Sequence, residues 1–340
     1  MGSIRIALLA VLAAFVTSSF SSHASDFARS GASEAESLGR KYPSLRALVV
    51  ARSDCLVYEY YRSDMAPETR SPIYSVTKSL LSILIGIAID AGYLRLDERL
   101  GEIFPEAAES SVDPRVRDIT VRDLLTMTAG FDVGQHDGTG VQVDAIWRWM
   151  LERPMDYVPG THFAYDDVSA NLLSVVLAKA IHQDAARFAQ QMLFEPLQIE
   201  DVAWISDAEG HLIADTGLRL TAREMAKIGL LYLQKGRWRG KRVVSEAYVL
   251  DSTTRHNDGG PPVNAAYGYL WWIASTKDGL RVFLAAGHNS QLILDVPDRN
   301  LIIAVAADGL PGGSRGFVEE AVLPNEATIP VSAPCIERLQ

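Results

Sequence analysis

Two short runs of mainly apolar residues lie near the start of the chain. Arg46–Ala51 and Cys55–Arg62 are rich in β-branched and aromatic residues, and the polar segment Arg52-Ser53-Asp54 separates them. This pattern predicts a β-hairpin. Four further strands are expected near the other end of the chain, at Tyr267–Ala274, Leu280–Ala286, Ser290–Val296 and Leu301–Ala307.

The middle of the chain has the apolar spacing of helices. Ser75–Ala91 predicts a helix that Gly92 ends. Thr120 with Asp123, and Thr221 with Glu224, match the capping-box pattern, which predicts a helix start at each threonine. Helices are also expected at Val143–Leu151, Val168–Ile181, Ala185–Phe194 and Phe317–Leu323.

This order of elements predicts a mixed α/β (α+β) protein. If the early hairpin pairs with the late strands, both ends of the chain build one antiparallel sheet flanked by helices. The central block then forms an inserted, mostly helical lobe. We expect a discontinuous α/β domain from residues 25–93 and 214–340 and a helical domain from residues 94–213, with the site in a cleft between them.

The first residues are typical of a targeting segment. Arg5 precedes the apolar run Ile6–Val16, and polar residues lead to a small-residue site that ends at Ala24. The run is too short to span a bilayer but suits the core of a signal peptide. We expect cleavage near Ala24 and a periplasmic or secreted protein, with no membrane span. In an oxidising compartment Cys55 and Cys335 either pair or remain two buried thiols.

Charge and motif content exclude several classes of function. The 340 residues include 42 acidic and 32 basic side chains, for a formal net charge of −10. Such a chain lacks the basic footprint of a nucleic-acid or anionic-membrane binder. It contains no HExxH, no CxxC, no phosphate-binding GxxxxGK[ST] and no strand-linked GxGxxG. We therefore expect no metal and no cofactor, and a small-molecule substrate as the partner, with the oligomeric state left open.

Two serines are candidates for a nucleophile. Ser314 lies in a GxSxG pattern, Gly312–Gly316, but a nucleophile elbow needs its histidine later in the chain, and no histidine follows His288. We expect Ser314 to be a loop residue. Ser75 begins an SxxK motif with Lys78, and this spacing places both side chains on one face of a helix.

The start of a helix suits a nucleophile. Its unpaired N–H groups favour negative charge that develops on the serine. The apolar residues that follow, such as Leu80, Leu81 and Ile83, are expected to bury Lys78 and lower its pKa towards that of a useful base. The four residues alone are equally consistent with a helix-capping serine followed by a solvated lysine.

Further segments extend the pattern beyond this motif. With Ser75–Ser79, the segments Ile119–Gly130, Phe163–Tyr165, Thr221–Gly229, Tyr267–Trp272 and Ala286–Gln291 resemble the serine β-lactamase and penicillin-binding-protein superfamily. The resemblance is to its class C-like branch, which includes esterases, D-aminopeptidases and 6-aminohexanoate-dimer hydrolases. It covers roughly residues 40–325 and implies the β-lactamase-like fold.

The resemblance implies roles for several residues. Tyr165 would carry the proton between Ser75 and the leaving group, in a motif whose usual asparagine is here Asp167. A carboxylate beside Lys78 would favour the ammonium form, so either Tyr165 takes more of the proton transfer or Asp167 points elsewhere. Asn171 also lies nearby, but its position within a helix favours capping or packing.

The family's third motif is matched by His288-Asn289-Ser290, in preference to Lys277-Asp278-Gly279 in a predicted turn. The resemblance implies that His288 contacts the substrate and that the amides of Ser75 and Gln291 form the oxyanion hole. Ser290 replaces the usual glycine. Trp271 and Trp272 are expected on opposite faces of a strand, with one in the core and one in the cleft.

These features predict a secreted serine hydrolase that acts on an amide or ester through a Ser75 acyl-enzyme. A largely neutral histidine and an added acidic residue are poorer hosts for the penicillin carboxylate than the family's usual lysine and threonine. A linear or neutral substrate is therefore favoured. The alternatives are a β-lactamase or D-Ala-D-Ala carboxypeptidase, and a catalytically inactive binding or sensor homologue.

Overall fold

The computed structural model describes residues 37–105, 113–133, 146–326 and 335–340. The expected signal peptide, with its cleavage site at Ala24, lies outside these residues, as do residues 143–145 of the expected helix Val143–Leu151. The chain forms two units, Met1–Pro43 and Ser44–Gln340. In the first unit residues 37–41 are helical. The second unit contains all of the strands that the structure describes.

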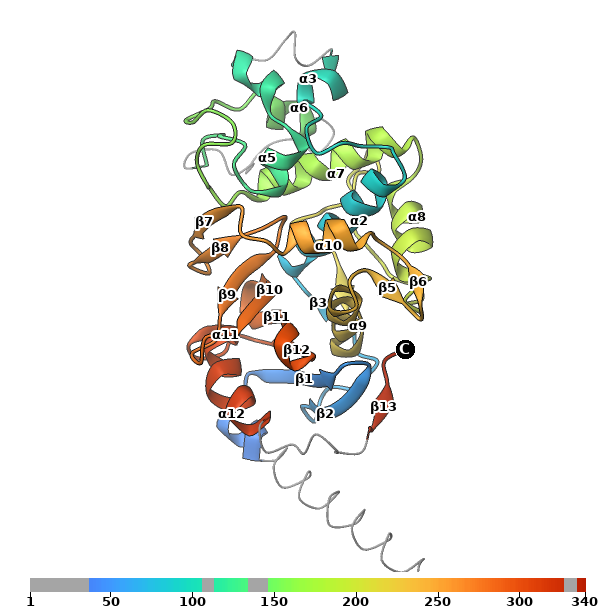
Figure 1. Cartoon of the computed structure of the whole chain (residues 1–340), viewed down its shortest axis with the longest axis vertical. Helices are drawn as coiled ribbons and strands as arrows, with labels where there is room; N and C mark the ends of the chain where they lie inside the picture. The colour runs from blue at the N-terminus through green and yellow to red at the C-terminus, as the bar shows by residue number, and fades with distance from the viewer. Residues whose placement is uncertain (1–36, 106–112, 134–145, 327–334) are drawn as a thin grey trace, which may run out of the picture. The chain divides into compact units, whose positions relative to one another are not determined.

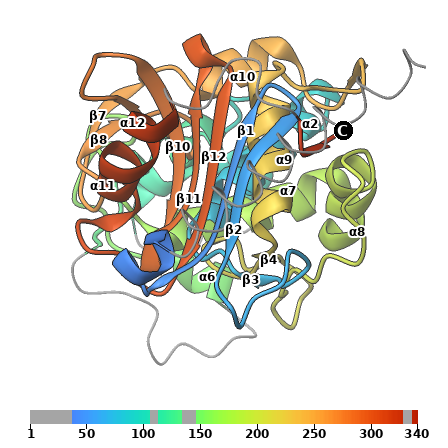
Figure 2. The same ribbon diagram turned by 90° about the horizontal axis from the view of Figure 1, so that it is seen from below.

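A nine-stranded antiparallel sheet forms the centre of this unit (Figures 1 and 2). The early hairpin pairs with the last long strand, with Leu48 opposite Val305, which confirms that both ends of the chain build the sheet. In sheet order the strands are β13 (Glu337–Arg338), β2 (Cys55–Tyr61), β1 (Leu45–Arg52), β12 (Leu301–Ala307), β11 (Gln291–Val296), β10 (Arg281–Gly287), β9 (Trp272–Ser275), β8 (Ala265–Tyr267) and β7 (Asn257–Gly260).

The C-terminal strand β13 was not expected from the sequence. It pairs with β2, where Glu337 lies opposite Leu56. The structure joins Cys55 and Cys335 in a disulfide, with their Cα atoms 5.3 Å apart. Of the two alternatives left open for these cysteines, the structure therefore has the pair, which holds the C-terminus against the edge of the sheet.

Helices cover both faces of the sheet. Helix α9 (Ala222–Leu233) packs on β1, β11 and β12, and α2 (Val76–Asp90) packs on β10 and β11. Figure 2 shows α11 and α12 on the opposite face. The remaining helical segments are α3 (Leu100–Ile103), η1 (Pro114–Asp118), α5 (Val121–Leu125), α6 (Ile146–Leu151), α7 (Asp167–Ile181), α8 (Ala185–Ala189), η3 (Gln190–Phe194), α10 (Glu246–Ser252), η4 (His288–Ser290), η5 (Pro297–Arg299), α11 (Gly313–Phe317), η6 (Val318–Val322) and α12 (Leu323–Glu326).

The predicted helix starts at both capping boxes are confirmed. The Thr120 and Asp123 side chains each accept from the other's backbone amide, as do Thr221 and Glu224. Helices α3, α5, α6 and α7 lie beyond α2, away from the sheet (Figure 1). The boundaries at residues 93/94 and 213/214 stay a prediction. Among the described residues, every helix is too short or too polar to cross a membrane.

One predicted strand was wrong. Tyr267–Ala274 is not continuous, because residues 268–271 leave the sheet between β8 and β9. At Gly268 a β-carbon would lie 2.2 Å from the Ser252 carbonyl oxygen. Leu270 has a left-handed φ of 57°, donates its amide to the Leu125 carbonyl and accepts a 2.6 Å bond from Ser79 Oγ. The turn thus connects α2 and α5, which the apolar pattern alone did not indicate.

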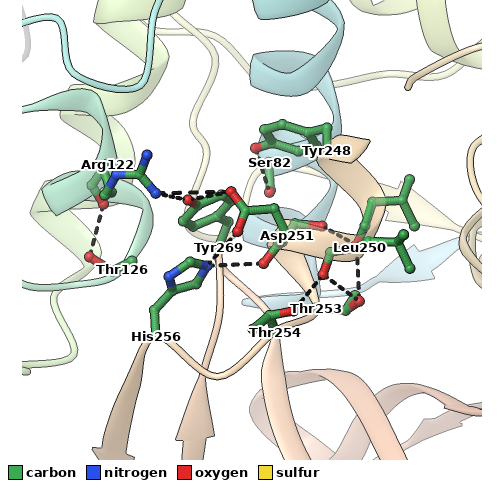
Figure 3. Close-up of polar contacts among 12 residues, drawn as sticks. Ser82, Arg122, Thr126, Tyr248, Leu250, Asp251, Thr253, Thr254, His256 and Tyr269 are labelled. Carbon is green, nitrogen blue, oxygen red and sulfur yellow. Dashed lines mark hydrogen bonds and ion pairs between the residues drawn. The ribbon is translucent and has the colours of Figure 1, made fainter. Parts of the chain in front are cut away.

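The neighbouring side chain, Tyr269, joins a polar network at the same turn (Figure 3). Its hydroxyl donates to Asp251 Oδ2 at 2.7 Å and accepts from Arg122. The His256 ring stacks on Tyr269 with the centroids 4.3 Å apart. Burial, followed by the bond to Asp251, raises the pKa of Tyr269 above its ordinary value. The network links α5 and α10 to the turn that supports α2.

A buried carboxyl lies between the sheet and α9. Asp295 on β11 is fully buried, and neither of its oxygens has a hydrogen-bond partner among the described residues. A β-carbon on Gly229 of α9 would lie 3.1 Å from it, so the two elements approach closely there. Burial raises the pKa of Asp295 well above its ordinary value.

Asp295→Asn is expected to stabilise the protein at pH 8 by about 1.4 kcal/mol or more, the free energy of one pKa unit, because the neutral amide removes the cost of a buried titrating carboxyl. Because the folded pKa is raised, the carboxyl destabilises the fold increasingly as pH rises above the unfolded pKa. The advantage of the variant should therefore shrink towards pH 4. Urea unfolding at both pH values measures this, and an equal difference at the two pH values would contradict a titrating carboxyl.

Candidate active site

A cavity of about 730 Å³ lies where the start of α2 meets the end of β10. It brings together most of the site residues expected from the sequence. Those that line it are Ser75, Tyr165, Asp167, Trp272, His288 and Ser290. The other expected residues, Lys78, Gln291 and Trp271, are buried and do not line the cavity.

Ser75 immediately precedes α2, as the helix pattern predicts. The preceding residue, Tyr74, has a left-handed φ of 48°, which an L-residue rarely adopts. Strand β10 passes close to this backbone, because a β-carbon on Gly287 would lie 2.4 Å from the Ile73 carbonyl oxygen and 3.2 Å from the Ser75 nitrogen. Glycine at position 287 therefore lets β10 approach the backbone of the candidate nucleophile.

Lys78 is almost fully buried and in contact with Ser75. Its Nζ donates to Ser75 Oγ at 3.0 Å and to the Asp215 carbonyl at 3.2 Å, and it lies 2.7 Å from Asp167 Oδ1. Three oxygens thus meet the three protons of an ammonium group. The predicted geometry of the SxxK motif is present, and the solvated lysine is excluded.

The expected lowering of the Lys78 pKa was wrong. Burial does lower the pKa of Lys78, but the nearby Tyr165 and Asp167, the hydrogen bond to Asp167 and the more distant Asp215 outweigh it. The pKa of Lys78 therefore lies above its ordinary value. The apolar surroundings are present, but of the two alternatives left open for Asp167 the structure has the one in which this carboxylate lies against Lys78 and favours the ammonium form.

The backbone at the start of α7 holds Asp167 against Lys78. Asp166 caps the helix by accepting from the amides of Val168 and Ser169, and its carboxylate binds Arg153 Nη1 at 2.9 Å. Both Asp166 and Arg153 are buried. This ion pair was not anticipated, because the two residues carry no recognisable motif.

Asn171 has a packing role, as its position in the helix suggested. Its Oδ1 accepts from the amides of Ala214 at 2.8 Å and Asp215 at 3.2 Å. These bonds orient the Asp215 carbonyl that accepts from Lys78. Asn171 therefore helps to position Lys78 through the backbone, and it does not replace the motif residue Asp167.

Asp167→Asn is expected to shift the part of the pH–rate profile that reports the titration of Lys78 to lower pH. Removing the carboxylate removes a charge that stabilises the ammonium form, so the pKa of Lys78 falls. A pH–rate profile with a nitrophenyl ester measures the shift. Asp97→Asn, at a side chain that is 85% exposed, is the matched control. An unchanged profile for Asp167→Asn would mean that the ion pair does not control the titration.

Tyr165 lies above the lysine and against an aromatic wall. Lys78 Nζ is 5.1 Å from the centroid of its ring, and Trp272 stacks on the same ring with the centroids 5.6 Å apart. Trp271 instead packs on Tyr232, with their centroids 4.5 Å apart, and is fully buried. One tryptophan thus lines the cavity and one lies in the core. Of the two candidates for substrate binding, Trp272 lines the cavity and Trp271 does not.

The segment that matches the third motif turns sharply between β10 and β11. Asn289 and Ser290 have φ values of 56° and 67°, so Ser290 adopts a left-handed conformation that glycine adopts without strain. Ser290 Oγ accepts from the Leu310 amide at 3.0 Å. Gln291 is buried, and its side-chain amide donates to the Ala307 carbonyl at 2.7 Å. His288 is exposed at the cavity wall.

The rival motifs occupy other positions. Lys277 lies in the turn between β9 and β10, 69% exposed, and is not part of the cavity lining. The prediction that Ser314 is a loop residue was wrong, because Ser314 lies in the first turn of α11, where it lines the cavity. Its neighbour Arg315 also lines the cavity and donates to Glu319 at 3.1 Å. The sequence argument missed this charged pair because it did not extend the helix predicted at Phe317–Leu323 back to Arg315.

The described residues contain no group of three or more histidine, cysteine or acidic side chains arranged to hold a metal ion. The site places the Ser75 hydroxyl beside the Lys78 ammonium group, and the phenol ring of Tyr165 lies near the same ammonium group. This set suits nucleophilic attack on a carbonyl.

Comparison with known proteins agrees with this geometry. The profile of the family described as Beta-lactamase matches residues 30–323. A 6-aminohexanoate-dimer hydrolase from Paenarthrobacter ureafaciens is 25% identical over 77% of this chain and 72% of its own length. The chain therefore belongs to the Beta-lactamase family, and it is a hydrolase of the serine hydrolase superfamily.

Solved structures support the fold assignment. A penicillin-binding protein homologue from Pyrococcus abyssi superposes with a TM-score of 0.66 at 20% identity, covering 89% of this chain and 76% of that one. A D-stereospecific amidohydrolase from Streptomyces sp. gives a TM-score of 0.63 at 15% identity, with coverages of 81% and 93%. These similarities establish the β-lactamase-like fold.

Proposed function

We propose that the protein is a secreted serine hydrolase that cleaves an amide or ester through a Ser75 acyl-enzyme. The observation that carries this proposal is the 3.0 Å contact between Lys78 Nζ and Ser75 Oγ in a cavity that Tyr165 also lines. Ser75 Oγ attacks the carbonyl carbon and the amine or alcohol leaves with a proton. Water then hydrolyses the new ester, which releases the acid and restores the serine.

The proton is transferred by Tyr165 more than by Lys78 in this proposal. Three oxygens surround the Lys78 ammonium and its pKa is raised, so it is a poor base at neutral pH. The phenolate form of Tyr165 accepts the Ser75 proton, becomes the neutral phenol and then passes that proton to the leaving group, which restores the phenolate. Lys78 stabilises the negative charge of the phenolate before and after this transfer.

The remaining roles concern the carbonyl oxygen and the substrate. We assign the oxyanion hole to the backbone amides of Ser75 and Gln291. Trp272, His288 and Ser290, as part of the cavity lining, contact the substrate. Lys78 with Asp167 and Arg315 with Glu319 are each charge-balanced pairs, so the cavity favours a linear or neutral substrate over an anion. The names of the hydrolase and amidohydrolase relatives support an amide.

Turnover of a panel of nitrophenyl esters, short linear amides and penicillins tests this proposal. We expect hydrolysis of the esters and linear amides at higher kcat/KM than the penicillins. Faster turnover of the penicillins would favour the β-lactamase or D-Ala-D-Ala carboxypeptidase alternative. No turnover of any member, together with an unreactive Ser75, would favour the inactive binding or sensor homologue.

We also propose export to the periplasm or the medium. The Cys55–Cys335 disulfide is consistent with an oxidising compartment. Amino-terminal sequencing of the protein secreted by a bacterial host should begin close to Ser25. Retention of the intact first residues in the cytoplasm would contradict export.

A further inference from the structure

Tyr74 combines backbone strain with a position beside the candidate nucleophile. Its φ of 48° lies in the left-handed region, where a β-carbon is unfavourable and glycine is not. Glycine would therefore fit the turn before Ser75 with less strain. A strained residue at a functional site suggests that its side chain contributes something the turn itself does not require.

The Tyr74 ring contacts His288. The two ring centroids are 5.4 Å apart and the planes meet at 77°, an edge-to-face arrangement, and both residues line the cavity. His288 is exposed, and its ring meets the ring of Tyr74 at the cavity wall. The ring contact with Tyr74 can therefore restrict the orientation of the imidazole.

The backbone places the two rings together. Gly287 approaches the Ile73 carbonyl so closely that a β-carbon there would lie 2.4 Å from the oxygen. The residues that follow each of these positions, Tyr74 and His288, consequently leave the same crossing point and extend into one cavity. Edge-to-face aromatic pairs have a preferred geometry, so such a pair limits ring orientation.

We propose that Tyr74 is a positioning residue that orients the His288 imidazole towards the substrate. The proposal rests on the proposed function, in which His288 contacts the substrate, and adds a residue that acts through it. The contact is one between two aromatic rings, so phenylalanine should substitute for tyrosine. Replacement of Tyr74 by glycine should therefore relieve the strain in the turn but lower the activity of the enzyme.

The test compares Tyr74→Phe, Tyr74→Gly and Tyr74→Asn, each with and without His288→Ala, using 4-nitrophenyl butyrate hydrolysis and thermal melting. Asparagine tolerates the left-handed region and lacks a comparable ring, so it covers the case in which the glycine variant is poorly folded. Tyr74→Phe should retain the wild-type kcat/KM. Tyr74→Gly and Tyr74→Asn should lose about three- to tenfold, the scale of one aromatic pair, without a lower melting midpoint.

The His288→Ala background separates positioning from direct contact. If Tyr74 acts through His288, the glycine and asparagine variants should have no further effect there. The same loss in both backgrounds would overturn the proposal, because Tyr74 would then act independently of His288. Full activity of Tyr74→Gly and Tyr74→Asn in the wild-type background would overturn it as well.

A readout that does not need turnover distinguishes this proposal from the proposed function. The NMR signal of the His288 Hε1 proton should carry a ring-current shift in the wild type and in Tyr74→Phe, and should lose it in Tyr74→Gly and Tyr74→Asn. An identical signal in all four proteins would overturn the positioning role. An inactive wild type with the expected signals would instead overturn the proposed function and leave the ring contact established.

Discussion

Ser75→Ala is expected to lower kcat/KM by about 10⁴-fold or more, the scale for loss of a catalytic serine nucleophile. Ser75 Oγ is in contact with the buried Lys78, and its backbone lies at the start of α2 beside the glycine of β10. Removing one oxygen leaves this backbone unchanged. Steady-state hydrolysis of a nitrophenyl ester measures the loss, and a melting curve should show an intact fold.

Ser314→Ala is the matched control. Ser314 lines the same cavity and lies in a GxSxG pattern, but it lacks the contact with Lys78 that Ser75 has. We expect this variant to retain most of its activity. The reverse result, an active Ser75→Ala and an inactive Ser314→Ala, would assign the nucleophile to α11.

Arg153→Met is expected to destabilise the fold by about 3–5 kcal/mol, the scale for breaking a buried ion pair from one side. The Arg153 side chain has no exposed surface, and its partner Asp166 is 7% exposed. Without the guanidinium, the Asp166 carboxylate remains buried with only the amides at the start of α7 and Ser169 Oγ as partners. Urea unfolding monitored by tryptophan fluorescence measures the change.

Two further variants test the explanation. Arg153→Met combined with Asp166→Asn should recover part of the stability, because asparagine can still cap α7 and no charge is left unpaired. Arg255→Met removes an exposed arginine paired with Asp258 and should cost about 0–1 kcal/mol. Equal losses for Arg153→Met and Arg255→Met would contradict the buried-charge argument.

Local sequence patterns predicted the elements that depend on neighbouring residues. Thr120 and Thr221 could be recognised as helix starts because their capping partners, Asp123 and Glu224, follow only three residues later in the sequence. The SxxK spacing brought Ser75 and Lys78 together for the same reason. The pairing of β1 with β12 is a long-range contact, but it followed from the presence of strands at both ends of the chain.

Features that depend on distant contacts were not predictable in this way. The break between β8 and β9 arises from Ser79 and Leu125, which lie far from Leu270 in the sequence. The raised pKa of Lys78 requires the direction of Asp167, which α7 determines. The strained φ of Tyr74 has no signature in the residue types around it.

The most direct test of the central claim is the identity of the residue that reacts as a nucleophile. The full-length protein is incubated with a fluorophosphonate, and intact mass spectrometry is followed by peptide mapping. We predict one adduct per chain, located on Ser75 and absent from Ser75→Ala. The absence of any adduct in the folded protein, or an adduct on another residue, would contradict the account.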